Sequence, residues 1–265
     1  MIHPLTNIHP DAKIGNNVTI ESFTSIAADV VIDEGTWIGS NVTIMAGSRI
    51  GKNNRIFPGA VIGAIPQDLK FQGEYTLLEI GDNNTIRECV TLNRGTKSRN
   101  TTKIGNNNLL MAYVHVGHDC IIGNMCILGN AVQVAGEVEI DDWAIIGGTT
   151  AIHQFSKIGK HTMVGGALKV LKDIPPYAKA GREPISFVGL NILGLRRRNF
   201  SRDIIDTLQN IYRIIYLSNL NVSQAVALIE TEVQPSEQRD DILAFIKSSK
   251  RGIMRGYKGS DSDDE

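Results

Sequence analysis

The sequence predicts a left-handed parallel β-helix followed by a smaller α-helical domain. Two observations predict this fold class. Every sixth residue from Ile2 to Ile62 is isoleucine, and 26 of the 29 positions in this register up to Val170 are Ile, Leu or Val. After Pro175 and Pro176 the apolar spacing becomes helical. A period of six fits neither a helix nor a coiled coil, but it is the period of hexapeptide β-helices.

Each hexapeptide is expected to form one short strand and one turn, so that three of them close one triangular coil of 18 residues. The aliphatic residue should point inward and stack on its equivalent in the next coil. The residue after it is often glycine, as at Gly15, Gly39 and Gly51, where we expect a corner with positive φ. The residue two places before it is often small or β-branched, as at Val18 and Thr24, and should fill the corner.

Two excursions interrupt the coils, near residues 63–79 and 93–103. Asp68, Glu74 and Ser98 occupy the aliphatic register there, yet the register resumes in phase after each excursion. Long loops on rigid scaffolds often carry function, although a purely decorative role is the alternative.

The β-helix should end at residue 175, because prolines cannot continue a strand ladder. Residues 176–255 are predicted to form the α-helical domain. Ser201 is a suitable N-cap for a helix over Arg202–Leu217 with one apolar stripe. Two further helices are expected, from Ser223 to about Glu232 and from about Ser236 to Lys250.

Composition narrows the function. The 265 residues carry a formal net charge of −1, which argues against a nucleic-acid binder. No apolar run reaches the roughly 18 residues of a membrane span, and no signal peptide is visible, so we expect a cytoplasmic protein. The three cysteines do not form the spacing of a disulfide framework. The polar, acidic residues 256–265 are predicted to be disordered.

A candidate site centres on His118. Because residues 18 apart should stack on neighbouring coils, His118, Gly136 and Gln154 are expected to form one column. His153 lies beside Gln154, and His115 should lie at the corner before His118. The column therefore gathers imidazole, amide and glycine backbone groups on one side of the β-helix.

The residues around His118 are compatible with several chemistries. A histidine oriented by Asp119 could act as a general base, since its ordinary pKa near 6.5 suits neutral pH. Cys120 could be a nucleophile with His118 as base, but it shares its register with Cys126, which indicates packing. His115, His118 and a histidine from a partner chain could bind zinc, as in trimeric γ-class carbonic anhydrases. A surface histidine without a catalytic role also fits the local pattern.

Over about residues 1–255 the chain resembles the UDP-N-acetylglucosamine O-acyltransferases, which catalyse the first step of lipid A synthesis. A hexapeptide repeat alone would indicate only the superfamily, whereas the loop and histidine motifs are far more specific. The segments that carry the resemblance are IPQDLKF (65–71), IRECVTLNRGT (86–96), NNLLMAYVHVGHDC (107–120), AIHQF (151–155), MVGG (163–166), DIPPY (173–177) and GLRRRNFS (194–201).

The resemblance implies a homotrimer with sites between neighbouring chains and without cofactor or metal. The reaction it implies moves a long 3-hydroxyacyl chain from acyl carrier protein to the glucosamine 3-hydroxyl of UDP-N-acetylglucosamine. His118 would be the general base, Asp119 its orienting partner, and the Gly136 N–H the oxyanion donor. Transfer would be direct, so that neither a serine nor a cysteine need be a nucleophile.

The resemblance also implies substrate contacts across the chain. A loop that touches substrate contains Gln67, Asp68 and Lys70, and contacts to the nucleotide sugar and acyl chain come from His115, His153 and Gln154. Gly166 matches a position associated with chain length. The residues near the nucleotide and the carrier are Asn191, Arg197 and Arg198. Glu137 departs from the family pattern, because well-known members carry histidine there. The resemblance therefore implies no substrate role for Glu137.

Three alternatives stay open from the sequence. The protein could be another hexapeptide acyltransferase that uses an acyl-CoA donor. It could be a zinc-dependent hydratase like the γ-class carbonic anhydrases, or a non-catalytic scaffold.

Overall fold

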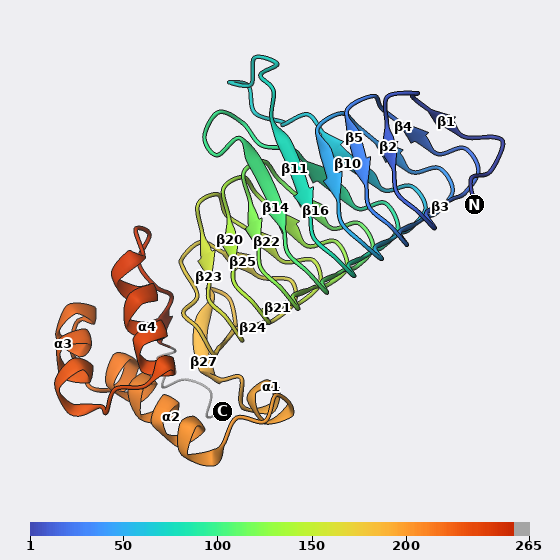
Figure 1. Ribbon diagram of the computed structural model, residues 1–265. Coiled ribbons are helices and arrows are strands. Elements are labelled where there is room, and N and C mark those ends of the chain that lie inside the picture. Colours follow the sequence, from blue (N-terminus) through green and yellow to red (C-terminus); the bar gives the residue numbers. More distant parts are fainter. Residues whose placement is uncertain (257–265) are drawn as a thin grey trace, which may run out of the picture.

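The computed structural model describes residues 1–256, which form an elongated β-helix with four helices at its C-terminal end (Figure 1). Residues in the aliphatic register fill the interior, and Ile38, Ile56 and Ile86 are fully buried there. The predicted fold class, a left-handed parallel β-helix with a C-terminal helical region, is confirmed.

Within the described residues each coil adds one short strand to each of three sheets, which form the faces of the β-helix. Sheet B consists of β1 (Asn7–Ile8), β4 (Ser25–Ile26), β7 (Thr43–Ile44), β10 (Val61–Ala64), β13 (Thr91–Asn93), β16 (His115–Val116), β19 (Gln133–Val134), β22 (Ala151–Ile152) and β25 (Lys169–Val170). Sheet C consists of β2 (Lys13–Ile14), β5 (Val30–Ile32), β8 (Ser48–Ile50), β11 (Leu77–Ile80), β14 (Thr101–Ile104), β17 (Ile121–Ile122), β20 (Glu139–Ile140) and β23 (Lys157–Ile158). Sheet A consists of β3 (Thr19–Ile20), β6 (Trp37–Ile38), β9 (Arg55–Ile56), β12 (Thr85–Ile86), β15 (Leu109–Leu110), β18 (Ile127–Leu128), β21 (Ile145–Ile146), β24 (Met163–Val164), β26 (Ala178–Gly181), β27 (Ser186–Leu190) and β28 (Arg255–Gly256).

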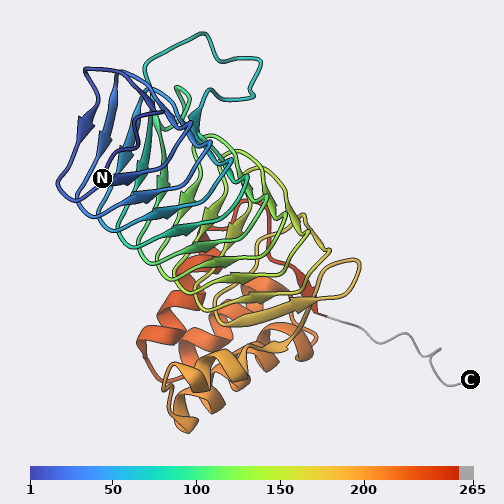
Figure 2. The same ribbon diagram turned by 90° about the vertical axis from the view of Figure 1, so that its right-hand side faces the viewer.

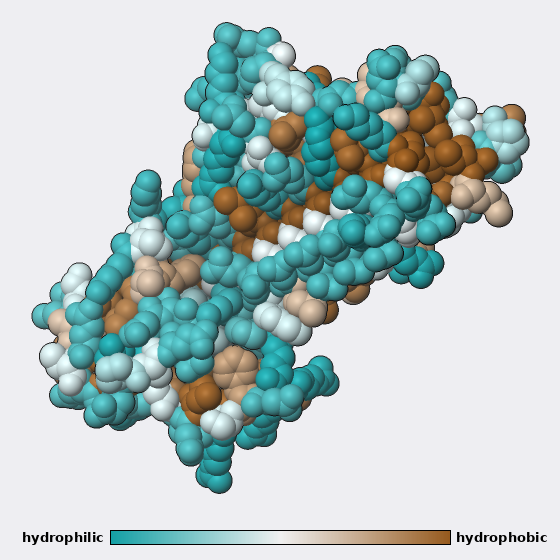
Figure 3. All heavy atoms as spheres, viewed as in Figure 1, coloured by the Kyte–Doolittle hydropathy of each residue, from teal (hydrophilic) through white to brown (hydrophobic). Residues whose placement is uncertain are grey.

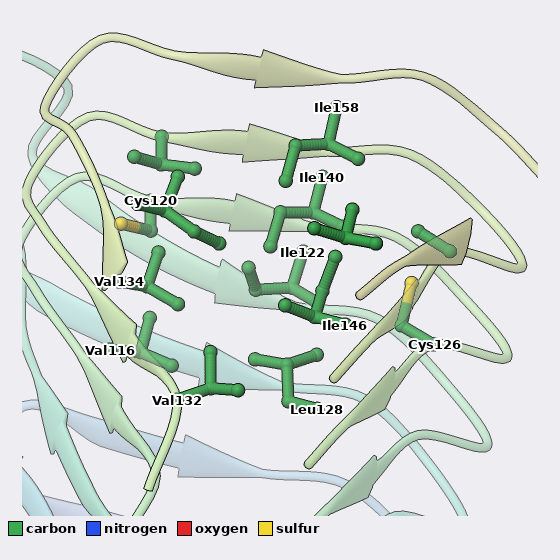
Figure 4. Close-up of a cluster of buried hydrophobic side chains, with 14 of the residues drawn as sticks. Val116, Cys120, Ile122, Cys126, Leu128, Val132, Val134, Ile140, Ile146 and Ile158 are labelled. Carbon is green, nitrogen blue, oxygen red and sulfur yellow. The ribbon is translucent and has the colours of Figure 1, made fainter. Parts of the chain in front are cut away.

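Strand pairing confirms the repeat arithmetic. In plain coils the partners lie 18 residues apart, as in the parallel pair His115 and Gln133. Across an excursion the same inward positions still pair, as Ile62 does with Leu92. Figure 4 shows the resulting interior, where aliphatic side chains of successive coils stack together with the Cys120 and Cys126 thiols.

The reason for glycine after the aliphatic position differs from the one we expected. Gly15, Gly51 and Gly123 do not lie in the left-handed region, whereas Asn17 and Asn53, two places further on, have φ of 57° and 53°. A Cβ on Gly15 would lie 2.8 Å from the backbone nitrogen of Glu34, one coil away. Close approach of the backbones of stacked coils therefore explains these glycines, and positive φ does not.

Both excursions leave the β-helix along the same edge, where strands of sheet B turn into strands of sheet C (Figures 1 and 2). We call this line the B–C edge. Loop 65–76 joins β10 to β11, and loop 94–100 joins β13 to β14 on the next coil. The following turn on this edge contains His118, so both loops arise beside the candidate site.

Strand pairing continues beyond the two prolines, which the sequence did not predict. Strand β26 pairs in parallel with β24, and β27 pairs antiparallel with β26. Pro175 and Pro176 lie at the corner between sheets C and A, ahead of Tyr177, whose N–H donates to the Lys160 carbonyl. Since a corner proline removes no ladder hydrogen bond, sheet A extends past the expected boundary at residue 175.

The helices agree closely with expectation. Helix α2 spans Arg202–Leu217 with Ser201 as N-cap, as predicted. Helix α3 (Val222–Glu232) begins one residue earlier than expected, because Asn221 and Gln224 form a capping box. Helix α4 (Glu237–Ser248) starts after Ser236, as predicted, and ends two residues early. The short helix α1 (Ile192–Arg197) was not predicted. Beyond Gly256, the tail predicted to be disordered lies outside the described residues.

Candidate active site

His118 and Asp119 form a hydrogen-bonded pair in the turn between β16 and β17. His118 Nδ1 lies 2.8 Å from Asp119 Oδ2, and the Asp119 side chain is fully buried. The carboxylate accepts the Nδ1 proton, which leaves the lone pair of Nε2 free to accept another. The 13% exposure of the His118 side chain lets a substrate reach it. A histidine oriented in this way is equipped to act as a general base.

Loop 94–100 surrounds the other side of the Asp119 carboxylate. The Thr96 hydroxyl donates to Oδ2 at 2.6 Å, and the Thr96 and Arg99 N–H groups donate to Oδ1 at 3.0 and 3.1 Å. Thr102 completes the arrangement, because its hydroxyl accepts the Asp119 N–H at 2.8 Å. Sequence reasoning placed no role on Thr96 or Arg99. Their only signal was the excursion itself, which contains the RGT of the family-like segment.

This environment perturbs the pKa of both partners. The hydrogen bond to Asp119 raises the pKa of His118 above its ordinary value, with burial opposing and the charges of Asp119, Asp68 and Glu137 adding to the rise. Burial alone would raise the pKa of Asp119, but hydrogen bonds from His118, Thr96 and Arg99 lower it overall. Asp119 therefore stays ionised at neutral pH, and His118 is a stronger base than a free histidine.

Gly136 lies directly above His118, as the repeat arithmetic predicted. The N–H of the next residue, Glu137, donates to the His118 carbonyl at 2.9 Å. A Cβ on Gly136 would lie 2.5 Å from His118 Nε2, so that only glycine leaves room for the imidazole. The Gly136 N–H donates to no acceptor among residues 1–256. An unpaired N–H beside a general base can stabilise an oxyanion.

The rest of the column is also in place. Gln154 lies one coil above Gly136, since the N–H of Phe155 donates to the Gly136 carbonyl. His153 is exposed beside it. His115 lies within strand β16 on sheet B and not at the expected corner, because its hexapeptide turns two residues later.

The histidines do not share a ligand arrangement. His115 Nδ1 is paired with the Thr91 hydroxyl at 2.8 Å, and burial lowers the pKa of this imidazole. Within the described part of the chain no group of three or more His, Cys, Asp or Glu side chains could hold a metal ion.

Cys120 packs inside the β-helix. Its thiol donates to the Ala135 carbonyl, and the side chain has no exposure. Burial raises its pKa to about 12. A thiol that stays protonated at neutral pH is a poor nucleophile, in agreement with the packing interpretation.

Loop 65–76 brings Asp68 near the pair, because the Asp68 charge contributes to the raised pKa of His118. Asp68 also accepts the Lys70 N–H at 2.9 Å. Gln67 and Lys70 are exposed on this loop. The three residues expected to touch substrate therefore project from the same edge as His118.

Four residues that the resemblance assigns to substrate binding lie away from the B–C edge. Gly166 lies in the turn from β24 to β25, where sheet A meets sheet B, so the whole width of sheet B separates its edge from the B–C edge. Asn191 caps α1 and donates to the His161 carbonyl at 3.0 Å. Arg197 is exposed, whereas the Arg198 guanidinium packs over the Trp143 ring, 4.9 Å from its centroid. Within one chain, therefore, Gly166 does not share an edge with His118.

Comparisons with known proteins agree with this architecture. The family model for domain 2 of UDP-N-acetylglucosamine O-acyltransferase matches residues 173–254, and the bacterial transferase hexapeptide model matches residues 29–64 and 101–136. The chain is 45% identical over 255 residues to the acyl-[acyl-carrier-protein]–UDP-N-acetylglucosamine O-acyltransferase of Thiobacillus denitrificans, covering 96% of this chain and 99% of the relative.

Solved structures are equally similar. A UDP-N-acetylglucosamine acyltransferase from Bacteroides fragilis superimposes with a TM-score of 0.95 at 56% identity, covering 96% of this chain and all of that one. A homologous structure from Acinetobacter baumannii gives a TM-score of 0.94 at 43% identity, covering 96% and 99% of the two chains. No helix within residues 1–256 is long and apolar enough to cross a membrane. Identity at this level over nearly the full length of both chains shows that the protein belongs to the UDP-N-acetylglucosamine O-acyltransferase family.

Proposed function

We propose that the protein transfers a long 3-hydroxyacyl chain from acyl carrier protein to the glucosamine 3-hydroxyl of UDP-N-acetylglucosamine, the first step of lipid A synthesis in the cytoplasm. The family membership supports the substrates. One observation carries the chemistry: the imidazole of His118 is held by Asp119 and lies against Gly136, whose N–H has no acceptor among residues 1–256.

The proposed reaction is a direct acyl transfer. His118 Nε2 removes the proton of the 3-hydroxyl as its oxygen attacks the thioester carbonyl carbon. The carbonyl oxygen becomes an oxyanion and accepts the Gly136 N–H, a contact typically worth about 3–4 kcal/mol of barrier. The C–S bond then breaks, and the carrier thiolate leaves with the proton that the His118 imidazolium returns. No acyl-enzyme forms, in keeping with the buried Cys120 thiol.

We further propose that the active unit is a homotrimer. Within one chain Gly166, Asn191 and Arg197 lie away from the B–C edge, so that they can reach one substrate with His118 only if a neighbouring chain supplies them. An apolar groove on sheet C, visible as a brown stripe in Figure 3, offers a surface for such a neighbour. Its apolar part consists of Val31, Ile50, Ile80, Ile104, Ile121 and Ile122, and glycines and charged side chains such as Arg49, Glu79 and Lys103 line the rest.

The decisive experiment measures product mass. Purified protein is incubated with UDP-N-acetylglucosamine and a panel of 3-hydroxyacyl donors carried either on acyl carrier protein or on CoA. A product heavier by one 3-hydroxyacyl group, formed faster from the carrier protein, is expected. A preference for CoA would favour the alternative hexapeptide acyltransferase, and no product from any donor would contradict the proposal. Light scattering should give three times the chain mass of 28.9 kDa, or about 87 kDa.

The same panel tests chain length. A Cβ on Gly166 would lie 3.1 Å from the Gly148 carbonyl oxygen, in a turn rich in glycine. Gly166→Met is expected to place a side chain in this turn and shift kcat/KM toward shorter donors. If the ratio between a long and a short donor changes by less than about twofold, roughly 0.4 kcal/mol, Gly166 does not set the chain length.

A further inference from the structure

Loop 94–100 contacts the catalytic turn more extensively than a passive loop would. Two of its residues, Gly95 and Thr96, are buried, although the loop connects β13 and β14 across the surface. Among residues 1–256, this loop supplies every hydrogen bond that the Asp119 carboxylate accepts from outside its own turn. We propose that Thr96 is a positioning residue, whose hydroxyl holds the Asp119 carboxylate in the rotation that lets it accept from His118.

The geometry of the two carboxylate oxygens carries this assignment. Oδ1 accepts the Thr96 and Arg99 N–H groups at 3.0 and 3.1 Å. Oδ2 accepts the Thr96 hydroxyl at 2.6 Å and the His118 imidazole at 2.8 Å, and the Thr96 N–H is shared with it at 3.1 Å. Without the hydroxyl, backbone N–H groups make two contacts with Oδ1 and one with Oδ2, so that Oδ2 can rotate away from His118.

The loop is held rigidly enough to serve this purpose. Arg99 Nη2 donates to Glu139 Oε1 at 2.6 Å, and the Ser98 hydroxyl donates to Glu137 Oε2 at 3.0 Å. Both acceptors belong to the coil above His118: Glu137 directly follows Gly136, and Glu139 lies in strand β20. The loop therefore spans from the Asp119 turn to the Gly136 turn and fixes the first relative to the second. Glu137, the departure from the family pattern, acquires a role here as an acceptor for the loop.

The assignment rests on the proposed function, because it concerns the orientation of the proposed base. Thr96→Ala removes the hydroxyl, and Thr96→Ser retains it. Lys97→Ala is the matched control, since Lys97 lies exposed in the same loop, and its side chain makes no hydrogen bond with any residue of 1–256, whereas its backbone N–H donates to Glu74. All variants are assayed as full-length protein, with melting temperature measured in parallel.

Thr96→Ala is expected to lower kcat about tenfold, equivalent to about 1.4 kcal/mol, with KM changed less than twofold. The acidic limb of the pH profile of kcat/KM should move to lower pH, because the raised pKa of His118 depends first on its hydrogen bond to Asp119. Thr96→Ser should restore both quantities, and Lys97→Ala should change neither.

Three outcomes would overturn the assignment. If kcat of Thr96→Ala stays within twofold, the hydroxyl does not position the pair. If kcat falls but the limb does not move, the effect is merely structural. If the limb moves to higher pH, Thr96 only shares the charge of Asp119 and does not orient it.

A measurement without substrate separates this assignment from the proposed function. The protein contains six histidines, and the ¹³Cε1 resonance of His118 can be identified by its loss in His118→Gln. Its pKa should fall in Thr96→Ala and not in Thr96→Ser. A fall in this pKa in a protein that acylates nothing would reject the function and keep the assignment. An unchanged pKa of His118 in Thr96→Ala, in a protein that does acylate UDP-N-acetylglucosamine, would keep the function and reject the assignment.

Discussion

The two loops of the B–C edge come from successive coils, yet they differ in almost every physical respect. Loop 65–76 exposes large apolar side chains, with Leu69 fully exposed and Ile65 at 54%. Loop 94–100 buries Gly95 and Thr96 and donates three backbone or hydroxyl hydrogens to one carboxylate. Loop 65–76, which we call the outer loop, presents side chains outward. Loop 94–100, which we call the inner loop, organises the interior of the site. Length alone therefore says little about what a loop does.

The loops also support each other at their bases. Asn93 Nδ2 donates to the Ile65 carbonyl at 2.5 Å, and the Arg94 guanidinium lies over the Phe71 ring, 5.6 Å from its centroid. The second loop thus contacts the first. We expect substitutions at the buried residues of loop 94–100 to change kcat, and substitutions at the substrate-contacting residues of loop 65–76 to change KM.

Removing the residue that the inner loop serves should have the largest effect. His118→Ala is expected to lower kcat by about 10²–10⁴-fold, the usual contribution of a general base, with a much smaller change in KM. Steady-state kinetics with saturating donor checks this. Retention of more than a third of the kcat would remove His118 from the mechanism and leave loop 94–100 without the function we give it.

A matched glycine pair sharpens the contrast between the loops. In Gly95→Ala the new Cβ would collide with the Thr101 backbone nitrogen and lie 2.9 Å from Asp119 Oδ1, so the carboxylate must move. Overpacking of this kind typically costs about 1–3 kcal/mol, and we expect kcat to fall about 10–100-fold.

Gly73→Ala is the control in the outer loop. Its Cβ would meet nothing within 4 Å, although φ of +89° adds backbone strain. Its kcat should stay within twofold of the wild type. Equal losses of kcat in the two alanine variants would show that the loops do not differ in the way described.

The outer loop should reveal itself in substrate binding. The Lys70 ammonium is exposed and makes no hydrogen bond or ion pair with any of the described residues. Lys70→Ala is expected to raise KM about tenfold with kcat nearly unchanged, the loss of one charged contact. Lys97→Ala, an exposed lysine of the inner loop, provides the comparison. A kcat defect in Lys70→Ala without a change in KM would contradict a purely binding role.

The smallest effect is expected from removing the charge of Glu137, which accepts the hydroxyl of Ser98 in the inner loop. Glu137 helps to raise the pKa of His118 through its negative charge. In Glu137→Gln this pKa should fall, so His118 is deprotonated at lower pH and the acidic limb of kcat/KM moves to lower pH by less than about one unit. The amide oxygen can still accept from Ser98, so kcat on the plateau should hold. A shift to higher pH would contradict the charge argument.

The helical region was predictable to a similar degree as the coils. The N-cap Ser201 and the start of a helix at Ser236 were identified from the sequence, because capping depends on a side chain and an N–H only a few residues apart. The antiparallel strand β27 escaped prediction, since it is defined by pairing with β26 and with β28, which comes from the far end of the chain. Local signals predict helix ends well and say little about such pairings.

What the sequence by itself determined is the β-helix and the column of His118, Gly136 and Gln154. Both follow from a period of six, which is repeated so often that inward and outward positions can be counted along the chain. Only the tertiary structure decided how Thr96 and Arg99 hold the Asp119 carboxylate. Those contacts depend on how a non-repeating loop folds back onto the β-helix. Contacts of that kind are set by closure in three dimensions and leave no periodic trace in the chain.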